Sequence, residues 1–127
     1  MGNGTWELTV RRHFSAAHAL REYEGECSRL HGHNYEVEVV VARRSLDSLG
    51  MAMDFGELKR LCNEVVDDLD HRMLNELPAF SEANATSERI AEYLYRELAR
   101  RLAGANVRLR LVRVWETPTS AAAYWED

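Results

Sequence analysis

Apolar and polar residues alternate along several short segments of the chain, which is the period of a strand with one buried face. The alternation is clearest where Val37, Val39 and Val41 share one face and Glu36 and Glu38 lie on the other. β-branched and apolar residues, which favour strands, are frequent in the same segments. The pattern predicts four strands, over residues 5–14, 35–42, 107–116 and 121–125.

Two other segments repeat their apolar residues three and four positions apart, as one face of a helix does. They are residues 54–69 and 87–102. Asp54, with Glu57 three residues later, matches a capping box at the start of the first helix. Thr86 is a suitable N-cap for the second helix.

The predicted order is therefore strand, strand, helix, helix, strand, strand. This order indicates an α+β fold, in which two helices pack on one face of a four-stranded antiparallel sheet. The length fits a single domain over residues 1–127. A four-stranded sheet leaves two open edges, and open edges favour pairing between chains, so we expect an oligomer.

Composition narrows the possible partners. The net charge of −5 argues against a nucleic-acid surface, which would need clustered Lys and Arg, but leaves room for one basic pocket for a phosphorylated small molecule. The chain begins without a signal-peptide pattern, and no segment approaches the roughly 18 consecutive apolar residues of a membrane span. We therefore expect a cytoplasmic protein with reduced thiols, acting on a small molecule rather than at a membrane.

Three of the five histidines are candidates for a metal site. His31 and His33 enter the second predicted strand, where residues two apart point to the same face. His18 lies just past the first strand, which the sheet can bring alongside. Three histidines leave a fourth position open, as in a catalytic zinc site. The alternative is a pair of surface histidines flanking a strand, because short motifs of this kind often arise by chance.

The two cysteines differ in their setting. Cys62 lies on the apolar stripe of the first helix, which predicts a buried packing residue. Cys27 lies in a polar segment four residues before His31, where a nearby cation would lower its pKa and make it a base or nucleophile.

Asp70 and His71 come at the end of the first predicted helix. A carboxylate beside an imidazole suits general acid/base chemistry, although a histidine at a helix C-terminus can simply interact with the helix dipole. Glu116 ends the third strand, where its carboxylate could bind the polar edge of a heterocycle or remain a solvated charge. His13 is expected to be structural or exposed, without a partner.

Taken together, these residues resemble the 6-pyruvoyltetrahydropterin synthase family, in particular its 6-carboxytetrahydropterin synthase branch. Each matching segment is weak alone, but six segments in the family's order are highly specific. The segments are Phe14–His18, Cys27–Tyr35, Met53–Phe55, Leu69–Asn75, Asn84–Glu88 and Val114–Thr117.

The resemblance implies a tunnelling fold, in which three subunits close a barrel, two trimers stack into a hexamer, and the active sites lie between subunits. It also implies a role for each matching residue. These roles are zinc ligands for His18, His31 and His33, catalysis for Cys27, Asp70 and His71, and pterin binding for Glu116, Thr86 and Ser87.

The implied substrate is 7,8-dihydroneopterin triphosphate. Zinc would lower the pKa of the substrate's side-chain hydroxyls, Cys27 and His71 would move protons, and triphosphate would leave. The three-residue spacing between Cys27 and His31 favours the carboxy branch, whose products are 6-carboxytetrahydropterin and acetaldehyde on the path to queuosine-type deazapurines. The alternatives are the pyruvoyl synthase, a non-catalytic pterin- or metal-binding relative, and a folate-related side activity associated with Glu26.

Overall fold

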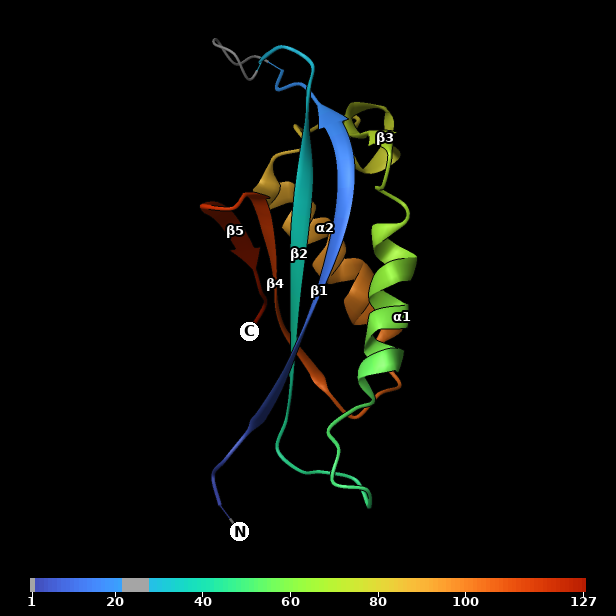
Figure 1. The fold of residues 1–127 in the computed structure, drawn as a ribbon, viewed down its shortest axis with the longest axis vertical. Coiled ribbons are helices and arrows are strands. Elements are labelled where there is room, and N and C mark those ends of the chain that lie inside the picture. The colour runs from blue at the N-terminus through green and yellow to red at the C-terminus, as the bar shows by residue number, and fades with distance from the viewer. Residues whose placement is uncertain (1, 22–27) are drawn as a thin grey trace.

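A computed structural model describes residues 2–21 and 28–127 of the chain (Figure 1). A curved sheet carries both helices on one face, and its strands follow the order β3-β1-β2-β4-β5. The elements are β1 (Trp6–His18), β2 (His31–Arg43), α1 (Phe55–Val66), β3 (Arg72–Met73), the 3-10 turns η2 (Leu74–Glu76) and η3 (Pro78–Phe80), α2 (Ser87–Arg101), β4 (Arg108–Thr117) and β5 (Ser120–Tyr124).

The predicted α+β class is confirmed, but the prediction of four antiparallel strands is wrong by one strand. β3 pairs in parallel with the end of β1, where Ala16 lies opposite Arg72 and Ala17 opposite Met73. A strand of two residues cannot display an alternating pattern. Its position depends on long-range pairing, and the sheet is therefore five-stranded and mostly antiparallel.

β1 and β2 are longer than the pattern predicts, and their extra residues carry three histidines. The two strands pair without interruption until His18 lies directly opposite His31. Ser15, Ala16 and Ala17 have weak strand propensity, so the pattern fades there, but pairing with β2 extends the strand through them. His18 consequently ends β1 instead of lying beyond it.

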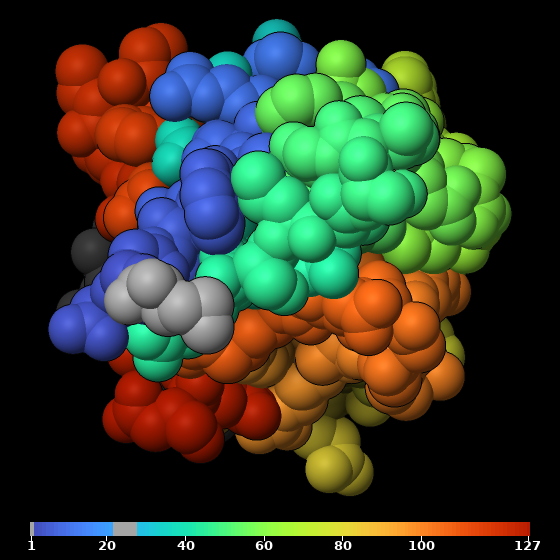
Figure 2. All heavy atoms as spheres, turned by 90° about the horizontal axis from the view of Figure 1, so that it is seen from below, coloured from blue at the N-terminus to red at the C-terminus, as the bar shows by residue number. Residues whose placement is uncertain are grey.

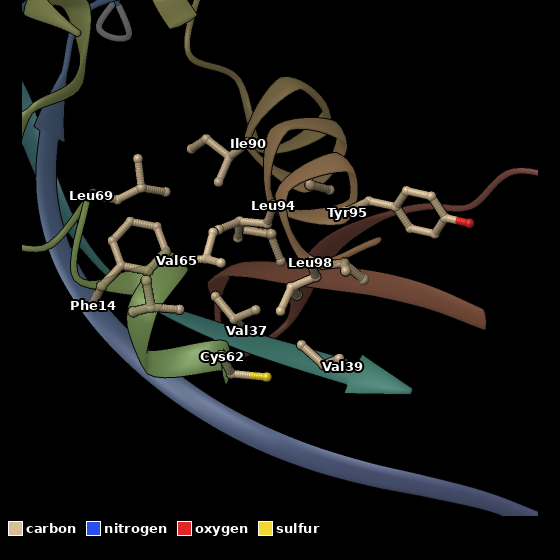
Figure 3. Close-up of a cluster of buried hydrophobic side chains, with 14 of the residues drawn as sticks. Phe14, Val37, Val39, Cys62, Val65, Leu69, Ile90, Leu94, Tyr95 and Leu98 are labelled. Carbon is tan, nitrogen blue, oxygen red and sulfur yellow. The ribbon is translucent and has the colours of Figure 1, made fainter. Parts of the chain in front are cut away.

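The core fills the space between the sheet and the two helices (Figure 3). Cys62 is fully buried there, as predicted, and burial raises the pKa of its thiol to about 12, which keeps the thiol protonated and unreactive. The core side chains labelled in Figure 3 are Phe14, Val37, Val39, Cys62, Val65, Leu69, Ile90, Leu94, Tyr95 and Leu98.

Both predicted N-caps are confirmed. The Asp54 carboxylate accepts a hydrogen bond from the Glu57 N–H at 2.9 Å, and the Thr86 hydroxyl accepts one from the Arg89 N–H at 3.2 Å. The Glu57 side chain, however, bonds to Arg60 instead of completing a capping box.

The prediction that the first helix continues to residue 69 is wrong, because α1 ends at Val66. Asp67 and Asp68 follow directly, and carboxylates are unfavourable at the negative end of the helix dipole. Asp70 and His71 therefore lie in the turn between α1 and β3. Among the described residues, no helix has the length and apolar character needed to cross a membrane.

Candidate metal and substrate site

Three imidazoles converge where β1 ends and β2 begins. His18 and His31 are directly opposite one another in the antiparallel pair, and His33 lies two residues farther along β2 on the same face. Their ligand nitrogens all lie within 4.8 Å of one another, so this group could hold a metal ion. The structure thus brings together the three histidines singled out in the sequence.

Hydrogen bonds orient two of these rings. The Nδ1–H of His18 donates to the Ala85 carbonyl at 2.7 Å, and the Nδ1–H of His31 donates to the Arg29 carbonyl at 2.7 Å. Because a carbonyl can only accept, Nδ1 of each ring carries a proton, and in the neutral ring Nε2 then has the free lone pair that a metal needs. Bonding of the second ring nitrogen to an outer partner is typical of metal-binding histidines.

The third ring is also suited to a cation. Nε2 of His33 is buried and has no hydrogen-bond partner within the described part of the chain. Burial lowers the pKa of His33, and the neighbouring His18 and His31 lower it further, while Glu116 acts in the opposite direction. A neutral imidazole is the form that binds metal, so an orphaned buried nitrogen beside two oriented rings fits a metal site.

Glu116 projects from β4 toward the same cluster. Its Oε1 lies 3.5 Å from Nε2 of His33 and 3.7 Å from Nε2 of His18. Tyr35, behind the rings, places its hydroxyl 3.5 Å from Nε2 of His18. Burial, and secondarily Glu116, raises the pKa of Tyr35, so its phenol remains a neutral hydrogen-bonding group.

The three histidines and Glu116 line a pocket of about 520 Å³, within the size range of small-molecule sites. Thr86 and Ser87, which begin α2, form one wall, and the Ser87 hydroxyl is buried without a hydrogen-bond partner among the residues described. The lining is His18, Leu20, His31, His33, Thr86, Ser87, Glu88 and Glu116.

Asp70 and His71 form a separate unit outside this pocket. Nδ1 of His71 lies 2.9 Å from Oδ2 of Asp70, while the Ser15 N–H donates to Oδ1 at 2.9 Å. The His71 N–H donates to the Ser15 carbonyl at 2.6 Å, which holds His71 at a positive φ of 58°. The alternative of a histidine at a helix C-terminus is wrong, since α1 has already ended.

The pair lies at a second pocket, and His33 is the one described residue that lines both this pocket and the first. His71 lines a second pocket of about 500 Å³ together with Ser15, Ala17 and Asn34. The side chains of these strand residues point to the opposite face from His18 and His31, because successive residues alternate. The His71 side chain is 82% exposed and offers its second ring nitrogen outward.

The remaining candidates have different outcomes. Cys27 and Glu26 lie outside the described residues. His13 is exposed as expected, but the expectation that it has no partner is wrong, because its Nε2 lies 3.1 Å from Oε1 of Glu36 on the adjacent strand. Tyr35 was not identified from the sequence, although its position two residues after His33 on one strand could have indicated it.

Comparison with known proteins gives a consistent result. Residues 7–127 match the model of the family described as 6-pyruvoyl tetrahydropterin synthase. The 6-carboxy-5,6,7,8-tetrahydropterin synthase of Bacillus subtilis is 37% identical over 127 residues, covering 94% of this chain and 85% of that protein. The dihydroneopterin monophosphate aldolase of Pyrococcus furiosus is 39% identical over 109 residues, covering 86% and 88%. The structure of 6-pyruvoyl tetrahydropterin synthase from Caenorhabditis elegans superimposes with a TM-score of 0.88 at 28% identity, covering 98% of this chain and 97% of that one.

Proposed function

The chain belongs to the 6-pyruvoyl tetrahydropterin synthase family, and from this premise we propose that it is a zinc-dependent 6-carboxy-5,6,7,8-tetrahydropterin synthase. It would convert 7,8-dihydroneopterin triphosphate and water into 6-carboxytetrahydropterin, acetaldehyde and triphosphate, on the path to queuosine-type deazapurines. The observation that carries this proposal is the pocket that combines three convergent imidazoles with Glu116 and the start of α2. A cytoplasmic location fits the free thiol of Cys62.

His18, His31 and His33 would hold the zinc ion. Three imidazoles, two of them with their outer nitrogens bonded to backbone carbonyls, match the ligand set of a catalytic zinc site, which keeps one position for substrate. When bound, zinc would polarise the side-chain hydroxyls of the substrate and lower their pKa.

Glu116 would anchor the pterin ring. Its carboxylate is partly exposed in the pocket and can accept two charge-assisted hydrogen bonds from the N–H groups of the heterocycle. The Ser87 hydroxyl needs a partner and the Thr86 segment lies beside it, so both would bind the substrate from the wall formed by α2.

Proton transfer would fall to Cys27 and His71. Asp70 accepts the Nδ1–H of His71, which fixes the tautomer and leaves Nε2 as the exchanging atom. Asp70 is in turn held by the Ser15 N–H, which lowers its pKa more than His71 does and keeps it ionised. Cys27 would act as the second proton-transfer group on the substrate side chain.

We further propose that one site is completed by two copies of the chain. His18, His31 and Glu116 line one pocket and His71 lines another, with His33 bordering both, and we infer that a single chain would not bring the two groups to one substrate. The strands β3 and β5 form open edges through which three sheets could close a barrel. Two stacked barrels would form the hexamer.

The direct test is to incubate the purified, zinc-loaded protein with 7,8-dihydroneopterin triphosphate and identify the products by mass spectrometry. 6-Carboxytetrahydropterin with acetaldehyde would establish the proposed reaction. 6-Pyruvoyltetrahydropterin would retain the site and change the branch. Intact substrate in the presence of bound zinc would favour a non-catalytic pterin-binding protein.

A second candidate activity rests on the Pyrococcus furiosus relative, which is named a dihydroneopterin monophosphate aldolase. The same zinc-loaded protein should therefore also be incubated with 7,8-dihydroneopterin monophosphate. Faster cleavage of the monophosphate than turnover of the triphosphate would make aldolase the principal activity.

A further inference from the structure

A third pocket is lined by three arginines, at the end of β2 that lies away from the histidines. Arg43 ends β2 and Arg44 follows it, while Arg108 begins β4 opposite Ala42. The pocket has a volume of about 660 Å³. Figure 2 views this end of the molecule, where the N-terminal segment in blue, the residues after β2 in teal and the start of β4 in orange meet.

This pocket has an uncompensated positive charge. Its lining contains no acidic residue, and in the part of the chain that the structure describes Arg44 and Arg108 have no carboxylate oxygen within 4.0 Å. The arginines of α2 behave differently, since Arg96 and Arg100 each pair with a glutamate one turn away. Two unpaired guanidinium groups in one pocket are notable in a chain with a net charge of −5.

Arg43 is the fixed member of the group. It donates to the Ala52 carbonyl at 3.1 Å, and its side chain is partly buried. Its nearby carboxylate is Asp47, whose pKa is lowered first by hydrogen bonds from the Met51 and Leu49 N–H groups and then by Arg43. Arg43 is thus held in place at the pocket wall by its bond to Ala52, while Arg44 and Arg108 retain N–H groups that can donate to a ligand.

We propose that this pocket binds an anion carrying several phosphoryl groups. Guanidinium groups match phosphate oxygens with paired, charge-assisted hydrogen bonds. The side chains of Thr5, Ser45 and Asn106 line the same space and add neutral donors. A chain of linked phosphates offers Arg44 and Arg108 more negative charge and more acceptor oxygens than a single phosphate does.

The site is distinct from the substrate position in the same chain. His31 and Arg43 are the first and last residues of β2, so the path between them along the extended strand is about 40 Å. A pterin held at Glu116 cannot reach that far. The inference therefore goes beyond the proposed function and does not depend on it.

The test is calorimetric titration of the full chain with inorganic triphosphate, at an ionic strength of about 0.15 M to suppress diffuse surface binding. The variant is Arg44→Gln/Arg108→Gln, in which both side chains are exposed and the fold should be retained. The matched control is Arg96→Gln/Arg100→Gln, which removes the same charge from α2. We expect saturable binding that weakens at least about tenfold in the variant and stays unchanged in the control.

Equal affinity of the wild type and the Arg44/Arg108 variant would overturn the proposal, as would equal loss in the control or no saturable binding. Inorganic phosphate binding as tightly as triphosphate would also overturn it. Titration with GTP identifies the source of the ligand, because tighter binding of GTP would indicate a nucleotide and equal binding the phosphate chain alone. Turnover of the pterin substrate is measured in a separate experiment, so a protein without turnover could still show triphosphate binding at this pocket.

Discussion

At the scale of single residues, the outer partner of each imidazole determines what the ring can do. The carbonyls of Ala85 and Arg29 accept hydrogen bonds from the Nδ1–H groups of His18 and His31, so in the neutral rings both Nε2 atoms are free to bind a metal. His13 has a carboxylate partner instead and lies exposed on the other face of the sheet. Identical side chains therefore serve different purposes.

Replacing one of the proposed ligands should abolish metal binding without unfolding the protein. We expect His31→Ala to weaken zinc affinity more than about 100-fold, because loss of a ligand should exceed the effect of losing an outer partner. Zinc per chain is measured by mass spectrometry after dialysis against a chelator. The control is His13→Ala, and equal zinc retention in both variants would refute the ligand assignment.

Glu116 should determine affinity for the pterin ring. Glu116→Gln keeps the shape of the side chain but replaces a charged acceptor with a neutral amide that also donates. We expect binding of an unphosphorylated pterin, followed by fluorescence, to weaken about 10- to 100-fold. Zinc content should remain unchanged, and an unaltered pterin affinity would show that the ring is anchored elsewhere.

The Asp70 carboxylate should make stability depend on acid pH. Its pKa is lowered from 3.8 in the folded chain, mainly by the Ser15 N–H and then by His71. A carboxylate with a depressed folded pKa stabilises the fold above its unfolded pKa and loses that contribution as pH falls through the folded value. The stability advantage of the wild type over Asp70→Asn should thus shrink as the pH falls below 3.8.

Urea unfolding across this pH range measures the difference. Asp67→Asn is the matched control, since Asp67 lies in the same turn and its side chain has no hydrogen bond among the described residues. A wild-type advantage over Asp70→Asn that grows as the pH falls below 3.8 would contradict the assignment.

At the scale of elements, the sequence predicts a helix or strand correctly where the spacing of apolar residues repeats several times. Val37, Val39 and Val41 predict β2 because all three pack against the helices. The final residues of β1 could not be predicted, because Ala16 and Ala17 become strand only through their partners in β2 and β3.

In the candidate site, too, some positions follow from local spacing and others depend on contacts between distant segments. The spacing of His31 and His33 predicts convergence, because a strand places both on one face. The location of His71 was not predictable, since it depends on the left-handed turn held by Ser15 and not on any local periodicity. The local pattern thus indicates which side chains of one strand share a face. Pairing between distant segments determines which residues of other strands and turns lie beside them.

The residues at the start of α2 have two roles, because Thr86 caps the helix and the neighbouring Ala85 carbonyl contacts a proposed metal ligand, His18. Thr86→Ala removes an N-cap and should destabilise the metal-free protein by about 1 kcal/mol in urea unfolding. Asp54→Ala removes the N-cap of α1 and should cost a similar amount. Only Thr86 follows Ala85, whose carbonyl orients His18, so only Thr86→Ala should also weaken zinc binding, by about tenfold. Equal zinc affinities in the two variants would separate the cap from the metal site.

At the scale of the whole molecule, the chain places its two chemical units on different sides of one sheet. The histidine pocket lies on the helix side, where α2 supplies a wall. The Asp70–His71 pair lies at β3, the edge of the sheet, with its imidazole exposed. We therefore expect His71 to complete the histidine pocket of a neighbouring chain that binds at this edge, and not the pocket of its own chain.

This arrangement predicts that two inactive variants can restore each other. His31→Ala should lack the metal half and His71→Ala the proton-transfer half, so each protein alone should be inactive while retaining the wild-type oligomeric state. The two variants are then co-refolded in equal amounts. Half of the chains supply an intact metal half and the other half an intact proton-transfer half, so random assembly should complete about a quarter of the sites. The measurement is turnover of 7,8-dihydroneopterin triphosphate relative to wild type. Inactive mixtures whose mixed assembly is established by native mass spectrometry would show that each site draws both halves from one chain.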